Sequence, residues 1–87
     1  MAAALQIWSA TFSRAFDALP GQVQADVQRK VDDMGARLDA FPHQRLKGRA
    51  EFKLRVGNYR VLYEFDSSQG RIHLHYVGHR REIYQHT

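Results

Sequence analysis

Apolar and polar residues alternate most regularly between positions 52 and 63, on both sides of the pair Gly57-Asn58. A period of two is typical of a half-buried strand, and a Gly-Asn pair between two such runs predicts a hairpin closed by a two-residue turn. Residues that flank such a turn face each other, and the pairing continues outward from there. The register therefore predicts these opposed pairs: Val56 with Tyr59, Arg55 with Arg60, Leu54 with Val61, and Lys53 with Leu62.

This register separates the hairpin into two faces, because successive side chains of a strand point to opposite sides. The apolar face holds Phe52, Leu54, Val56, Tyr59, Val61 and Tyr63. The opposite face holds the cations Lys53, Arg55 and Arg60. Two arginines that face each other repel and cost stability, so the arrangement favours an anion bound on that face. The alternative explanation is the ordinary solvated side of an amphipathic sheet.

Two helices are predicted before the hairpin. After Gln22, apolar residues recur at spacings of four, four, three and four positions, which predicts an amphipathic helix packed on the sheet. The residues of this apolar stripe are Val23, Val27, Val31, Met34 and Leu38. A shorter helix is predicted to begin near Arg14, capped by Thr11 or Ser13. Pro20 ends it, because proline disfavours a helical conformation in the preceding residue.

The remaining segments complete a small mixed fold. Residues 5–9 predict a first strand, and alternation over 71–77 predicts a last strand after a turn at 66–70. Segment 39–48 has the composition of a loop, and 80–84 is too short for an isolated helix, so we predict a turn there. The predicted class is α+β in the order β-α-α-β-β-β, with two N-terminal helices on one face of a mainly antiparallel four-stranded sheet. At 87 residues, we expect a single domain over 1–87.

The composition favours an anionic partner. Thirteen Lys and Arg against nine Asp and Glu give a formal charge of +4, which favours nucleic acid or an acidic protein. Cations crowd the stretch from Arg45 to Arg60. There is no cysteine, so disulfides and cysteine-based zinc sites are excluded. No apolar run is long enough to cross a bilayer and no signal-peptide pattern is present, so we expect a cytoplasmic protein without membrane association.

Three blocks of the sequence carry a resemblance to a known family. The blocks are Leu46-Lys47-Gly48, residues 52–63, and residues 77–84. With the order of the elements, they resemble RelE-type toxins of the RelE/ParE superfamily of bacterial toxin–antitoxin systems. The resemblance implies a ribosome-dependent endoribonuclease that inhibits translation by cleaving mRNA in the ribosomal A site, without a metal or other cofactor. It also implies three partners, namely the ribosome, mRNA and a cognate antitoxin, RelB-like or from another small family.

The same resemblance implies a set of catalytic positions: Lys53, Arg55, Arg60, Arg80 and Tyr84. Two features depart from the family pattern. Arg55 stands where the best-studied enzyme has a second lysine, and the segment between Arg80 and Tyr84 is short. Tyr84 is a candidate for stacking on a nucleobase.

Cleavage of RNA without a metal requires a base for the ribose 2′-hydroxyl, cations for the phosphate and an acid for the leaving 5′-oxygen. Cationic neighbours favour the neutral amine of a lysine, which makes Lys53 the candidate base. Arg55 and Arg60 are the candidate phosphate clamps, because a guanidinium fork matches paired phosphate oxygens. The resemblance assigns the acid role to Arg80, but arginine rarely releases a proton. His79 therefore stays open as a competing acid.

Further candidates lie outside this set. A basic rim for RNA binding is expected from Arg45, Lys47, Arg49 and Arg81. His73 and His75 are expected to share one face of the last strand, but no third ligand is evident near them, so we predict no metal site.

Two other functions stay open at this point. A ParE-like relative of the same fold inhibits DNA gyrase by binding, and a non-catalytic module only holds nucleic acid on its basic face. The expected antitoxin is acidic or amphipathic, and it binds either as a helix in a groove or as an added strand.

Overall fold

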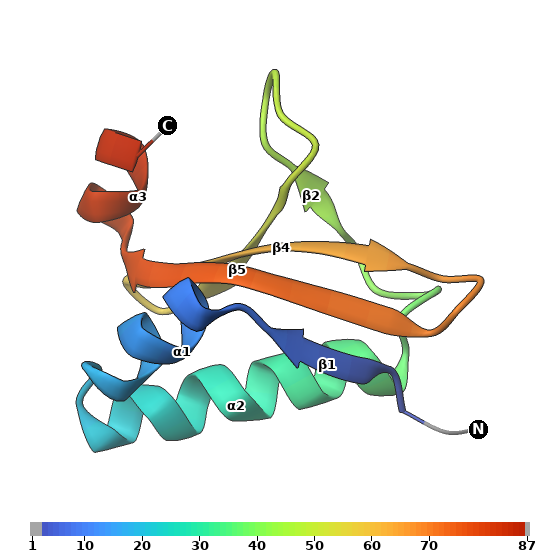
Figure 1. Cartoon of the computed structure of the whole chain (residues 1–87), viewed down its shortest axis with the longest axis horizontal. Coiled ribbons are helices and arrows are strands. Elements are labelled where there is room, and N and C mark those ends of the chain that lie inside the picture. Colours follow the sequence, from blue (N-terminus) through green and yellow to red (C-terminus); the bar gives the residue numbers. More distant parts are fainter. Residues whose placement is uncertain (1–2, 87) are drawn as a thin grey trace.

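The computed structural model describes residues 3–86, with side chains as far as Ile83. The elements are, in order, β1 (Leu5–Trp8), α1 (Ala10–Asp17), α2 (Gly21–Ala36), β2 (Gln44–Arg45), β3 (Phe52–Val56), β4 (Tyr59–Asp66), β5 (Arg71–His79) and α3 (Arg80–His86). The sheet order is β1-β5-β4-β3-β2, and only β1 pairs in parallel. Helices α1 and α2 lie on one face, and α3 stands beyond the end of β5 on the other side (Figure 1). The predicted α+β class is confirmed.

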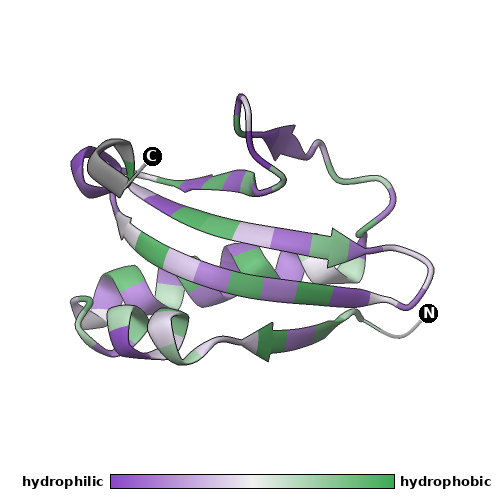
Figure 2. Ribbon diagram, turned by 45° about the horizontal axis from the view of Figure 1, so that its top comes forward, coloured by the Kyte–Doolittle hydropathy of each residue, from purple (hydrophilic) through white to green (hydrophobic). Residues whose placement is uncertain are grey.

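The core forms where the stripe of α2 meets the sheet. Val27, Val31 and Met34 are buried, as are Leu54 and Tyr63 on the sheet face that α2 covers. Figure 2 shows the alternation of apolar and polar residues along β4 and β5 that this packing requires. In the described part of the chain, no helix has the length and apolar character needed to cross a membrane.

The hairpin between β3 and β4 has the predicted register. All of the opposed pairs predicted from the sequence are present, including Arg55 with Arg60 and Lys53 with Leu62. Gly57 has a φ of 59°, and within the described part of the chain only glycines have a positive φ. A positive φ at the first central residue alone is typical of a type II′ turn, which glycine adopts without strain.

The start of α1 differs from the prediction. The helix begins at Ala10, and its N-cap is Ser9, whose Oγ accepts a hydrogen bond from Phe12 N at 3.0 Å. The same hydroxyl donates to His75 O at 3.0 Å. The predicted caps Thr11 and Ser13 were wrong, because a contact with β5 places the cap directly after β1.

Two segments have more regular structure than predicted. Residues 44–45, expected to be loop, form the short edge strand β2, and residues 80–86, expected to be a turn, form α3. A helix this short is not stable alone, but Ile83 is only 1% exposed and Arg80 N donates to Asn58 O at 2.8 Å. Tertiary contacts with the sheet and with the hairpin turn therefore stabilise α3.

An irregularity in β5 changes the faces of its last residues. Leu62 pairs with Tyr76 but Tyr63 pairs with Leu74, so His75 is an extra residue in β5. Such a bulge reverses the alternation beyond it. Val77 therefore joins the main core, and simple alternation from the sequence does not predict this.

Candidate functional site

Two rows of residues cross the sheet face that points away from α1 and α2, which we call the outer face. The first row is Arg55 on β3, Arg60 on β4 and Gly78 on β5. The second row is Lys53, Leu62 and Tyr76. The fold therefore brings the predicted cations of the hairpin together beside the start of α3.

Lys53 and Arg55 are available to a ligand. Arg55 is exposed and Lys53 is half-buried. Within the described side chains, neither forms an ion pair or a side-chain hydrogen bond. Their charges can therefore meet an anion without first breaking a salt bridge.

Arg60 has a different environment from the one we expected. It is only 7% exposed, and its Nη1 donates to Gly57 O and to Tyr59 O, both at 2.8 Å. The partial negative charges of these carbonyl groups compensate the buried guanidinium. We expected Arg60 to meet an anion together with Lys53 and Arg55, but it is buried, and its hydrogen bonds to Gly57 O and Tyr59 O stabilise the hairpin turn.

Gly78 allows α3 to lie close to the first row. A Cβ at this position would lie 2.8 Å from Glu82 Oε2 and 2.9 Å from Tyr76 Cε2. Tyr76 Oη donates to Glu82 Oε2 at 3.3 Å. Burial, and then the nearby charge of Glu82, raises the pKa of the Tyr76 hydroxyl above its usual value. A carboxylate therefore stands at one end of the cationic row.

The candidates at the end of β5 are divided between the two sides of the sheet. His79 pairs with Tyr59 in the row of the buried Val56, so it lies on the side of α1, away from Lys53. Its Nδ1 accepts from Arg81 N at 3.3 Å. Arg80 is exposed at the start of α3. The structure thus separates His79 from the candidate base, and the side chain of Tyr84 lies outside the described residues.

The four candidates for the basic rim are scattered. The Arg45 guanidinium lies 4.9 Å from the centre of the Phe52 ring, and the register places both on the face that α2 covers. Arg49 is paired with Glu51. Lys47 is exposed in the loop after β2, which projects from the sheet (Figure 1), and Arg81 is exposed on α3. They do not form one continuous rim.

One residue that the sequence did not single out holds the loop before β2 on the sheet. His43 Nε2 lies 2.8 Å from Leu38 O, a group that can only accept, so Nε2 carries the proton. Nδ1 then accepts from Tyr63 Oη at 2.6 Å. Burial raises the pKa of this hydroxyl well above its usual value. The His43 ring also stacks on Phe65 with centroids 3.9 Å apart.

Histidines and carboxylates do not gather into a metal site in the part of the chain whose side chains are described. No group of three or more such residues could hold an ion there. His75 Nε2 instead lies 3.0 Å from Glu64 Oε2.

The fold is that of toxins in the RelE/ParE superfamily. The family described as ParE toxin of type II toxin-antitoxin system, parDE, matches residues 7–84. Because this match spans most of the chain, the protein belongs to that family. Comparison with curated proteins gives no significant match.

Solved structures of RelE toxins are similar to this chain. The RelBE2 toxin–antitoxin complex from Mycobacterium tuberculosis matches with a TM-score of 0.72 and 24% identity, over 92% of this chain and 94% of that one. The RelB–RelE complex from Methanococcus jannaschii matches with 0.72 and 23%, over 92% and 96%. The isolated E. coli RelE toxin matches with 0.75 and 17%, over 97% and 94%. At these identities the likeness shows the shared fold.

Proposed function

We propose that this toxin is an endoribonuclease that cleaves mRNA on the ribosome without a metal ion. The observation that carries the proposal is the pair Lys53 and Arg55, adjacent on one strand face and without carboxylate partners among the described side chains. A phosphate bound there meets two cations that need no rearrangement.

The residues divide the chemistry as follows. Lys53 removes the proton from the ribose 2′-hydroxyl, and such base assistance contributes about 10²- to 10⁴-fold in rate. Arg55 holds the phosphate through its guanidinium fork. Arg60 is a positioning residue, because it fixes the turn on which Arg55 depends. Arg80 is a second clamp or the acid, and Tyr84 stacks on a base. His79 is not kept as the acid, because it lies on the other side of the sheet from Lys53.

The proposal includes an inhibitory partner. Several solved relatives are described as complexes of RelE with RelB antitoxins. We propose that an antitoxin neutralises this chain by covering Lys53 and Arg55 with an acidic or amphipathic segment.

Inhibition of DNA gyrase is the second candidate. It is favoured by the match to the family of ParE toxins and by the burial of Arg60, which leaves one expected phosphate clamp little exposed. Inhibition by binding does not need a base and an acid around one phosphate.

A cleavage assay separates the two candidates. Purified protein is incubated with an mRNA, with and without programmed ribosomes, in excess chelator, and the 3′ ends are mapped. We expect cuts only on ribosomes, unaffected by chelator, lost in Lys53→Ala and Arg55→Ala and retained in Arg14→Ala, a control at an exposed cation of α1. Intact mRNA together with inhibited DNA supercoiling by gyrase would favour the second candidate instead.

A further inference from the structure

A groove runs between α2 and the edge of the sheet at β3. Strand β2 pairs only with Phe52 and Lys53, so beyond them the edge of β3 has no neighbouring strand in the described part of the chain. The groove has a volume of about 290 Å³. Its lining includes Lys30, Phe41, His43, Gln44, Lys53 and Arg55.

The groove is cationic on both sides. Lys30 contributes from α2, and Lys53 and Arg55 contribute from β3. None of the described residues that line it is acidic. A site lined by one sign of charge attracts the opposite charge. Outside the groove, the charge of Lys30 also acts on Asp33, whose main partner is Arg37.

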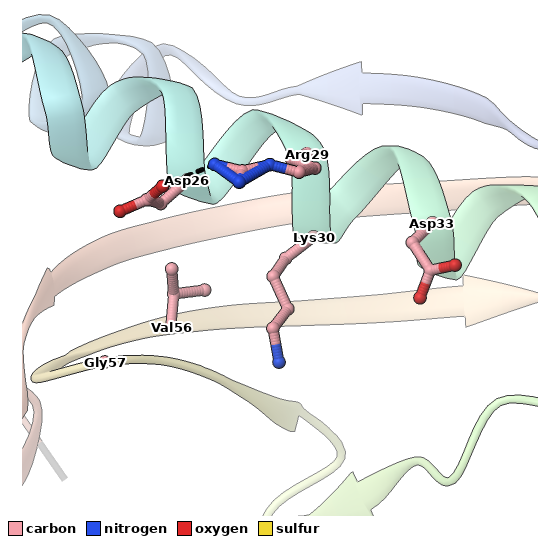
Figure 3. A pocket seen from close by; sticks show the side chains of 6 residues that line it. All are labelled: Asp26, Arg29, Lys30, Asp33, Val56 and Gly57. Atoms are coloured by element: carbon pink, nitrogen blue, oxygen red, sulfur yellow. Dashed lines mark hydrogen bonds and ion pairs between the residues drawn. The ribbon is translucent and has the colours of Figure 1, made fainter.

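The acidic residues of α2 near Lys30 already have partners. Asp26 is 2.5 Å from Arg29 Nη2, and Asp33 is 2.9 Å from Arg37 Nη2. In Figure 3 the Lys30 side chain extends from α2 toward the strands, whereas Arg29 is turned to Asp26. The ammonium group of Lys30 forms no ion pair or hydrogen bond within the described side chains.

The backbone of β3 adds a donor. Val56 flanks the two-residue turn and bonds to Tyr59, and bonding in an antiparallel pair alternates along the strand. The N–H of Arg55 therefore points to the open edge. Backbone N–H groups are frequent phosphate ligands in complexes with nucleic acids.

We propose that this groove, defined by Lys30, Lys53 and Arg55, holds a phosphodiester of the substrate RNA strand next to the phosphate that is cleaved. The inference rests on the proposed function. Lys53 and Arg55 belong both to the outer face and to the groove, so a strand that reacts at Lys53 continues around the edge of β3 toward Lys30. The rings of Phe41 and His43 offer packing surfaces for sugars or bases.

Binding of an uncleavable RNA tests this inference. The probe is a labelled 2′-O-methyl oligoribonucleotide of ~10 nucleotides, which lacks the attacking hydroxyl, and affinity is measured from about 50 to about 200 mM salt. Lys30→Gln should weaken binding about fivefold near 0.1 M salt and reduce the salt slope by about 0.7, the share of one phosphate contact. Lys30→Arg should restore both values, and Arg14→Gln, an exposed cation on α1, should match the wild type.

Several results would overturn the inference. One such result is that the wild type does not bind the oligoribonucleotide. Another is that Lys30→Gln and Arg14→Gln bind it with equal affinity and equal salt slope. If Lys30→Gln weakens binding only to a polyglutamate peptide, the groove holds an acidic peptide; if it weakens binding only to ribosomes, the groove contacts ribosomal RNA.

The inference and the proposed function fail separately. If the wild type cleaves mRNA on ribosomes but Lys30→Gln binds the probe normally, the groove assignment is wrong and the nuclease stands. If the wild type does not cleave but its binding depends on Lys30, the nuclease is wrong and the groove stands.

Discussion

The bond between His43 and Tyr63 provides a quantitative test of how the loop before β2 is held. The test uses His43→Ala, Tyr63→Phe and the double variant. Tyr63 is fully buried, and His43 Nδ1, 2.6 Å away, is the acceptor that its hydroxyl has in the structure.

The expected losses follow from the contacts of His43. Without it, the Tyr63 hydroxyl has no acceptor, which costs about 1–3 kcal/mol. The stacking on Phe65 contributes about 0.5–1.5 kcal/mol, and the bond to Leu38 O about 0.5–1.5 kcal/mol. His43→Ala should therefore destabilise the protein by about 4 kcal/mol, and Tyr63→Phe, which removes one hydrogen bond, by about 1 kcal/mol.

The double variant contains the decisive information. Phenylalanine at position 63 has no hydroxyl to leave unsatisfied, so the double variant should be about 2 kcal/mol more stable than the sum of the single losses predicts. The assay is urea-induced unfolding followed by circular dichroism, with comparison of midpoints at unchanged slope. His43→Ala combined with Tyr76→Phe is the control pair and should be additive. Additivity within about 0.5 kcal/mol for His43 and Tyr63 would refute the reasoning.

Two further predictions concern packing and pH. Gly78→Ala should cost about 1–3 kcal/mol, because the new Cβ would lie 2.9 Å from the Tyr76 ring. Gly21→Ala is the control, because a Cβ at this position meets open space and the backbone has no positive φ, so this variant should be neutral or stabilising. Equal unfolding midpoints for Gly78→Ala and Gly21→Ala would contradict the close packing between Gly78 and α3. The raised pKa of Tyr63 means that its stabilising contribution is complete below the unfolded pKa of about 10 and is lost as the pH rises from there toward the folded value. The melting temperature should therefore fall more in the wild type than in Tyr63→Phe between about pH 9 and about pH 11, and parallel curves would show that Tyr63 does not ionise differently on folding.

Elements with local causes were predictable from the sequence. The turn at Gly57-Asn58 sets the pairing of β3 with β4, because a two-residue turn allows only one register between its flanking strands. The stripe of α2 needed only the helical period, and Val27, Val31 and Met34 are buried as it predicts. The same register places Lys53 and Arg55 on one face, which is half of the candidate site.

Elements that depend on distant contacts were not predictable. Helix α3 was expected to be a turn, because seven residues do not form a stable helix alone. Ile83 and the bond from Arg80 N to Asn58 O stabilise it from residues far away in sequence. The extra residue His75 likewise reverses the alternation of β5 without a signal in the sequence.

The availability of charge was decided by the tertiary structure. Three cations on one hairpin face look equivalent in the sequence, but Arg60 is buried and donates to the carbonyl groups of Gly57 and Tyr59, whereas Arg55 is exposed and Lys53 is half-buried. Lys30 looks like any solvated helix residue until the fold brings it to the open edge of β3. The sequence by itself determined which residues form strands, helices and faces, because periodicity and turn chemistry act over a few residues. The tertiary structure decided which cations meet, which are buried and where the groove lies, because those outcomes depend on contacts between segments that are distant along the chain.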